Sequence, residues 1–216
     1  MVRVFVCVKE PVHVFLVSLY RRPPRSTLSS SSAASNVYKR QAGTPGGVLS
    51  HTLLSLHVCN FRINGDIVGE AAINTAICGS FQVPVTMISG NSEVLPEATA
   101  TMPGGFTFAT TKKSIGYTAA ICKSLPESHA EIKTAAHDAV LNFRENAVSP
   151  LTYQGQVTME VEAYRREFAD KACVVAGIEK TGERSFAATA DTAAECFELI
   201  WRGITYGMDE PPWMLV

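Results

Sequence analysis

The amino-acid sequence predicts an α/β fold in which a mixed sheet is flanked by helices. Segments with the alternating or continuous apolar residues of strands take turns along the chain with segments whose apolar residues recur every three or four positions, as in helices. The sequence contains no internal repeat. Its 216 residues, 46% of them hydrophobic, are enough to bury a sizeable core, so one main domain is the expectation.

The first half of the chain predicts a strand, a hairpin and a helix. Met1–Val8 has the alternation and β-branched content of a first strand. Leu53–Ile63 is rich in apolar residues and should contain extended structure that ends at Asn64-Gly65, a strong hairpin signal. Gly69–Gly79 predicts a short buried helix, because its alanines suit tight packing against a sheet and its last glycine is a suitable C-terminal stop.

The second half predicts two strands and two helices. Val83–Ser89 is a nearly continuous apolar run, as in a buried strand, and Val157–Ala163 alternates like a half-exposed strand. Ser124–Glu127 is a capping-box pattern, which apolar residues at helical spacing follow, namely Ile132, Ala136, Val140 and Phe143. Asp191 is expected to cap the last helix, whose inward side chains are predicted to be Ala194, Phe197, Trp201 and Ile204.

Charge and cysteine content limit the function classes. A formal net charge of −1, without a basic stripe, gives no electrostatic reason to expect a nucleic-acid or membrane partner. The apolar stretch Val12–Leu19 is too short to span a bilayer. The six cysteines are scattered singly among apolar neighbours, which favours buried thiols in a reducing cytoplasm. Small molecules and peptides remain as substrate classes.

The N-terminal segment differs in composition from the rest of the chain. Residues 20–41 are biased toward proline, serine and arginine, which predicts a disordered linker. Residues from about 13 to 41 also resemble translated sequencing-adapter read-through, an interpretation under which the authentic protein begins near Ala42 and its natural N-terminal part is missing. The expected division is therefore a non-family segment, 1–41, and an α/β domain, 42–216.

Two chemically suggestive residues lie close in sequence. The Thr44–His51 run places a histidine after a glycine pair that lets the backbone approach another group, and Glu70 follows at the head of the predicted helix. Metal-assisted hydrolysis can use both groups. On these residues alone a structural role is favoured for His51, and the helix macrodipole is enough to explain Glu70.

A family resemblance changes that balance. From about residue 42 to the C-terminus the chain resembles the zinc-dependent D-aminopeptidase family of bacterial dipeptide-transport operons. The residues that match are Thr44–His51, Arg62–Gly65, Val68–Glu70, Val83–Val85 and Ser89-Gly90. The resemblance implies that His51 is the catalytic residue and Glu70 a zinc ligand. It also implies a metallo-aminopeptidase that acts on short peptides with an N-terminal D-residue and assembles into ring-shaped homo-oligomers.

The N-terminal segment departs from the family pattern. The family's first strand ends in an Asp-x-Glu pair, whereas Lys9-Glu10-Pro11 follows here and the first aspartate is Asp66. Lys39 stands where the family has a histidine ligand, and an ammonium must lose its proton before it can bind zinc. The chain is therefore expected to be an incomplete version, lacking the family's N-terminal strands. The alternatives are a non-catalytic α/β fragment and a divergent homologue that binds peptides without a competent metal site.

The remaining polar motifs have plainer interpretations. His57 is expected to serve packing, and His129 and His137 to lie on a helix surface. Gly46-Gly47 lacks the Gly-Lys-Ser/Thr ending of a phosphate loop. Thr111–Ser114 could place a lysine near a substrate carboxylate, although a solvated charged turn is the simpler expectation.

Overall fold

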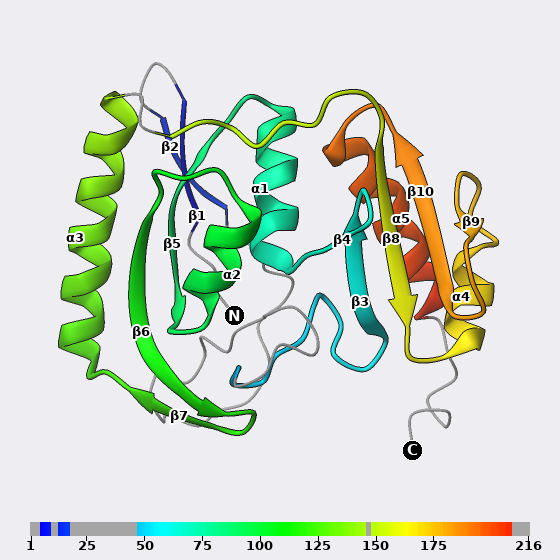
Figure 1. Ribbon diagram of the computed structural model, residues 1–216, viewed down its shortest axis with the longest axis horizontal. Coiled ribbons are helices and arrows are strands. Elements are labelled where there is room, and N and C mark those ends of the chain that lie inside the picture. The colour runs from blue at the N-terminus through cyan, green and yellow to red at the C-terminus, as the bar shows by residue number, and fades with distance from the viewer. Residues whose placement is uncertain (1–4, 10–12, 18–46, 146–147, 209–216) are drawn as a thin grey trace.

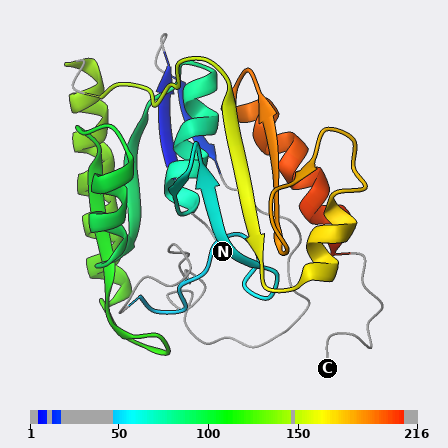
Figure 2. The same ribbon diagram turned by 45° about the vertical axis from the view of Figure 1, so that its right-hand side comes forward.

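The computed structural model describes residues 5–9, 13–17, 47–145 and 148–208 (Figure 1). Two five-stranded sheets stand on either side of a central helix, and further helices pack on each sheet (Figures 1 and 2). The α/β class with a mixed sheet is confirmed. The described strands form two sheets, because β8 and β10 continue the antiparallel pairing begun by β3 and β4 instead of extending the first sheet.

The first sheet has the order β2-β1-β5-β6-β7. Its strands are β1 (Phe5–Lys9), β2 (His13–Val17), β5 (Val85–Asn91), β6 (Thr107–Gly116) and β7 (Ala119–Cys122). Only β5 and β6 run parallel. The helix α3 (Leu125–Arg144) packs on one face, where Ala135 and Ala139 meet Met87 and Ala109. The helices α1 (Glu70–Ser80) and α2 (Val94–Thr101) pack on the other.

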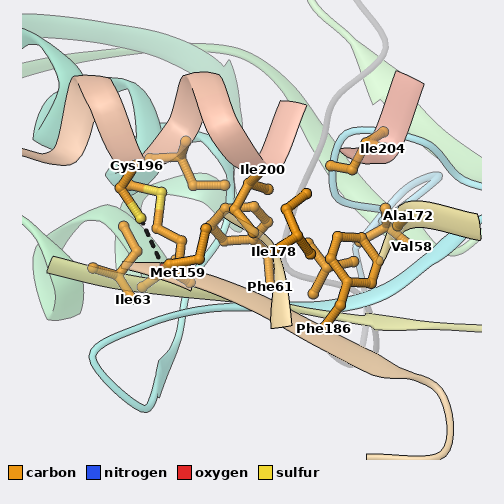
Figure 3. Close-up of a cluster of buried hydrophobic side chains, with 14 of the residues drawn as sticks. Val58, Phe61, Ile63, Met159, Ala172, Ile178, Phe186, Cys196, Ile200 and Ile204 are labelled. Atoms are coloured by element: carbon orange, nitrogen blue, oxygen red, sulfur yellow. Dashed lines mark hydrogen bonds between the residues drawn. The ribbon is translucent and has the colours of Figure 1, made fainter. Parts of the chain in front are cut away.

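The second sheet has the order β4-β3-β8-β10-β9 and is antiparallel throughout. Its strands are β3 (Val58–Ile63), β4 (Asp66–Ile67), β8 (Val157–Ala163), β9 (Glu179–Lys180) and β10 (Ser185–Ala190). One face packs on α4 (Arg166–Ala172) and α5 (Ala193–Gly207), where the largest core of the described residues forms (Figure 3). On the opposite face Glu162 accepts hydrogen bonds from Asn60 and Arg184. This division follows from the alternation along β8.

The central helix α1 joins the two halves of the molecule. Ala72, Ile73 and Ala76 pack into the core of the second sheet, while Ala71 packs against the first. Small side chains on all sides allow this double burial. Gly79 lies inside the helix and is not its stop: a Cβ there would stand 1.8 Å from the carbonyl oxygen of Leu151. Close approach of a neighbouring backbone, not chain termination, therefore requires this glycine.

The helix ends partly match the predictions. Ser124 and Glu127 form the predicted capping box of α3. The N-cap of α5 is Thr192, whose hydroxyl accepts a hydrogen bond from Glu195 N, so the expectation for Asp191 is wrong by one residue. The buried face of α5 is correspondingly set by Cys196, Ile200 and Ile204, with Phe197 and Trp201 at its edge. A one-residue change rotates the helical face by about 100°.

The predicted hairpin turn is confirmed. Asn64 and Gly65 have φ values of 51° and 92° between β3 and β4, and Asn64 Oδ1 accepts a hydrogen bond from Thr158 N. Of the five cysteines whose side chains are described, all are free; only Cys196 is buried and Cys122 is exposed, so the expectation of generally buried thiols is wrong.

Several expectations concern residues outside those that the structure describes. They are Lys39, Thr44–Gly46 and most of the segment 1–41, so the division at residue 42 and the absence of family strands stay predictions. The strand expected over Met1–Val8 corresponds to β1, which begins at Phe5. None of the described helices has both the length and the apolar character needed to cross a membrane.

Candidate active site

The predicted catalytic and metal-binding residues meet at one edge of the first sheet. The helix α1 and the strand β5 are consecutive and run in opposite directions, so the N-terminus of α1 and the carboxyl end of β5 lie at the same edge (Figure 1). The segment 47–57 runs along this edge below α1 in that view. In open α/β sheets, ligands bind outside the carboxyl ends of strands. The edge is therefore the natural place for a substrate.

The loop that contains His51 has two left-handed residues that are not glycines. Leu49 has a φ of 47° and Leu53 a φ of 57°. Leu54 N donates a 2.7 Å hydrogen bond to Thr52 O around Leu53, which makes a γ-turn with a positive central φ, a rare and strained conformation. Such strain clusters at functional sites. No sequence pattern predicts this turn, because leucine is among the residues least expected at positive φ.

Hydrogen bonds fix both sides of the loop. On one side, Leu49 N donates to Tyr117 O at 2.6 Å, which attaches the loop to the connection between β6 and β7. His51 Nδ1 lies 2.7 Å from Leu49 O. Because a carbonyl oxygen only accepts, this contact assigns the proton to Nδ1 and leaves Nε2 as the basic nitrogen of the neutral ring. The imidazole is thus oriented by its own loop.

The carboxylate of Glu70 holds the other side of the loop. Leu53 N donates a 2.8 Å hydrogen bond to Glu70 Oε1, and Glu70 is buried at the first position of α1. The N-cap residue, Gly69, has no side chain that could cap the helix. Glu70 is the acidic residue of the first turn, where a negative charge interacts favourably with the helix dipole. His51 and Leu53 are two residues apart, which limits their Cα separation to about 7 Å. The structure thus brings His51 and Glu70 into one neighbourhood.

The other histidines of residues 47–145 and 148–208 serve packing or lie on the surface. The His57 ring stacks on Phe168 with centroids 5.0 Å apart, so its predicted packing role is confirmed. His129 and His137 are exposed on α3, as predicted.

The motif Thr111–Ser114 differs from its simpler expectation. It belongs to β6 instead of a solvated turn, and Lys112 is only 5% exposed. Burial lowers the pKa of the Lys112 ammonium, an effect that the neighbouring Cys122 partly opposes. The burial of Lys112 was missed because its neighbours in sequence are polar.

The described side chains do not form a zinc site by themselves. Within residues 47–145 and 148–208, no three His, Cys, Asp or Glu side chains lie close enough together to hold one metal ion. A hydrolytic zinc site normally has about three protein ligands and an open water position. Glu70 is the described residue that the sequence proposes as a ligand. A complete centre would need ligands from elsewhere.

A cavity of about 130 Å³ lies far from this edge. Gly79 and Ser80 at the C-terminal end of α1 line it together with Leu151, Tyr153 and Thr192. The eleven residues of α1 separate it from Glu70 by about 15 Å. The cavity thus contains none of the predicted catalytic or metal-binding groups.

Comparison with known proteins identifies the family. The model of the D-aminopeptidase family, peptidase family M55, matches residues 31–202. The chain belongs to this family. Its members are metallo-aminopeptidases. The match begins before Ala42 and includes both His51 and Glu70.

Two relatives show the extent of the likeness. The D-aminopeptidase of Bacillus subtilis (strain 168) is 30% identical over 162 residues, which are 74% of this chain and 57% of the relative. The solved structure of the Zn-dependent D-aminopeptidase DppA from Bacillus subtilis, a self-compartmentalizing protease, superposes with a TM-score of 0.69 at 26% identity. It covers 80% of this chain and 62% of DppA. The chain therefore spans less than two thirds of these relatives' length.

Proposed function

We propose that the protein is a zinc-dependent aminopeptidase that releases N-terminal D-amino acids from short peptides in the cytoplasm. Family membership supports the reaction class, and the Zn-dependence of DppA supports the metal. The arrangement of His51 supports the assignment of a proton-transfer group. The preference for D-residues rests on family membership alone.

The contact between His51 Nδ1 and Leu49 O is the observation that supports catalysis most directly. With Nδ1 donating to Leu49 O, Nε2 carries the lone pair that a general base needs. The strained loop fixes this orientation before substrate arrives, which lowers the entropy cost of aligning the base. We assign to His51 the acceptance of a proton from the water that attacks the scissile amide. His51 then delivers this proton to the leaving amine.

Glu70 has two proposed tasks. Its carboxylate accepts the hydrogen bond from Leu53 N that anchors the loop, and it is the zinc ligand that the family resemblance assigns. Zinc held by Glu70 and by ligands beyond the described residues would polarise the scissile carbonyl.

A second candidate function is peptide binding without catalysis. The observation in its favour is that the described part of the chain offers one proposed zinc ligand, Glu70, where about three are normal. Under this alternative the loop and the sheet edge still bind a peptide, but amide hydrolysis does not occur.

Zinc content and hydrolysis of D-alanyl amide by the purified chain separate the two functions. The aminopeptidase proposal expects stoichiometric zinc after dialysis and turnover that His51→Ala abolishes with zinc retained. The exposed His129 gives a matched control, since His129→Ala should leave both unchanged. Turnover that survives His51→Ala would refute the role of that residue. Absence of both zinc and turnover would favour the binding function.

Self-association is also proposed. DppA is self-compartmentalizing, and the hairpin formed by β6 and β7 exposes Ile115, Tyr117 and Ile121, each close to 60% accessible. Apolar side chains grouped at an exposed hairpin suit an interface between copies. Light scattering after size exclusion should show a homo-oligomer that Ile121→Lys weakens, and an unchanged mass in that variant would exclude the hairpin.

A further inference from the structure

Two exposed tyrosines flank the loop that contains His51. Tyr117 lies in the turn between β6 and β7 and is 59% exposed, and Tyr164 directly follows β8 and is 48% exposed. The two residues thus belong to different sheets. Figure 1 shows the β6–β7 hairpin and the end of β8 at the same edge of the molecule, with the segment 47–57 between them. This edge is the one at which the candidate catalytic loop lies.

Main-chain hydrogen bonds attach both tyrosines to this loop. Tyr117 O accepts from Leu49 N at 2.6 Å, and the carbonyl oxygen of Leu49 lies 2.7 Å from His51 Nδ1. Because these two contacts share one residue, the Tyr117 carbonyl lies within about 9 Å of the imidazole. At the other end of the loop, Tyr164 N donates to His57 O at 3.0 Å. The backbones of both tyrosines are therefore fixed to the loop that contains His51.

The phenol groups of the two tyrosines lie near each other. Burial raises the pKa of Tyr164, and the charges of Cys59 and Tyr117 raise it further. An electrostatic effect of Tyr117 on Tyr164 requires a short distance between side chains that come from different sheets. The Tyr164 hydroxyl also shares a hydrogen bond with the Cys59 thiol, which orients its ring. Two aromatic rings thus border the same solvent-exposed space beside the loop.

The position of Glu70 indicates which part of a peptide reaches this space. Glu70, the proposed zinc ligand, is buried at the start of α1, whereas both tyrosines are exposed. An aminopeptidase holds the N-terminal residue of its substrate at the metal, so the remainder of the peptide extends away from the metal toward solvent. The residue that leaves with the amine protonated by His51 is therefore the one that lies nearest the tyrosines.

We propose that Tyr117 and Tyr164 contact the side chain that follows the scissile bond and select a large apolar residue there. This assignment rests on the proposed function, which supplies the peptide and its direction. Tyrosine rings provide a large contact area at a small cost in side-chain entropy, and a second aromatic ring adds a specific geometric preference. Ile115 and Ile121 lie on the strands of the same hairpin, so the subsite borders the proposed interface between copies.

The test compares two dipeptides that differ only in the leaving residue, D-alanyl-phenylalanine and D-alanyl-glycine. The ratio of their kcat/KM values should favour phenylalanine. Tyr117→Ala and Tyr164→Ala should each lower this ratio about threefold to tenfold, mainly through KM, as expected for the loss of one aromatic contact. Tyr117→Phe and Tyr164→Phe keep the rings and should keep the ratio. Tyr206→Ala removes a tyrosine of α5 that is 52% exposed and gives the matched control.

A binding measurement makes the test independent of turnover. N-acetyl-D-alanyl-phenylalanine and N-acetyl-D-alanyl-glycine lack the free amine, so an aminopeptidase does not cleave them. In the whole chain with ¹³C-labelled tyrosine rings and added zinc, the phenylalanine probe should shift the ring resonances of Tyr117 and Tyr164 more than the glycine probe does. The resonances of Tyr206 should not move with either probe.

Each outcome decides the assignment. A ratio that falls in both alanine variants and is kept in the phenylalanine variants and in Tyr206→Ala supports it. No preference in the wild type, an unchanged ratio in either alanine variant, or an equal loss in Tyr206→Ala excludes the subsite and leaves the proposed function intact. If neither dipeptide is hydrolysed, the proposed function fails and the ring resonances decide: selective shifts support the subsite, and their absence overturns it.

Discussion

Replacement of Glu70 by glutamine and by alanine separates its two proposed tasks. Its hydrogen bond from Leu53 N is charge-assisted and partly buried. A bond of this kind contributes about 1.5–3 kcal/mol, and an acidic group at a helix N-terminus about 0.3–1 kcal/mol. Glu70→Ala removes both and leaves Leu53 N without this acceptor, so it should destabilise the fold by about 3 kcal/mol. Glu70→Gln keeps a carbonyl oxygen and should cost about half as much.

Thermal unfolding measured by circular dichroism in the presence of a chelator reports these costs without any contribution from bound metal. For a chain of this size about 1 kcal/mol corresponds to roughly 2–4 °C in Tm. Glu70→Ala should therefore lower Tm by about 9 °C and Glu70→Gln by about 4–5 °C. Zinc binding should weaken in both, because glutamine keeps the shape of the side chain but not its charge.

Glu167 provides the control. It also lies in the first turn of a helix, α4, but it is exposed, so Glu167→Ala should change stability by less than about 1 kcal/mol. The reasoning fails if Glu70→Ala melts no lower than Glu167→Ala, or if the alanine and glutamine variants melt together. In either case the bond between Glu70 and Leu53 would not stabilise the loop.

Two further variants test the packing and the buried charge. Gly79→Ala should lower the free energy of unfolding in urea by about 1–3 kcal/mol, because its Cβ would overlap the backbone carbonyl of Leu151. Gly203→Ala should change it by less than about 1 kcal/mol, since the atom that its Cβ would overlap is the flexible tip of Ile178. Equal losses in the two variants would contradict this account. Lys112→Met should stabilise the chain most at neutral pH, since the lowered folded-state pKa means that protonated Lys112 opposes folding. As pH rises through that pKa toward the ordinary value of 10.5, wild-type stability should approach that of the variant, and a pH-independent difference would exclude the charge effect.

Periodic patterns predicted the elements whose environment is uniform along their length. The alternation over Val157–Ala163 and the capping box at Ser124 predicted β8 and the start of α3 correctly, because each depends on local geometry. The buried helix α1 was predicted from its alanines and from Gly79 as its stop, although the helix continues to Ser80. The cap of α5 was misplaced by one residue, since Asp191 and Thr192 are both good caps and only the tertiary fit of Cys196 and Ile200 decides between them.

The division into two sheets could not be predicted in the same way. Strand patterns report burial of one or both faces, not which strand is the neighbour. The chain between α3 and β8 passes close to Gly79, and β8 then pairs with β3, which lies about a hundred residues earlier in the sequence. A pairing between strands so distant in sequence leaves no local pattern.

The candidate site was even less predictable from local sequence patterns than the division into two sheets. His51 and Glu70 were found because a family resemblance assigned them, and the structure adds the reason for their proximity, the bond from Leu53 N to Glu70. Asn91 and Lys112 had no such signal. Their side chains share a face only because Thr111 is an extra residue in β6, and a bulge leaves no mark in a strand's composition. An ordinary ladder would have paired Asn91 with Thr111 and directed Lys112 to the opposite face. The face to which Lys112 points therefore depends on one inserted residue that no sequence pattern marks.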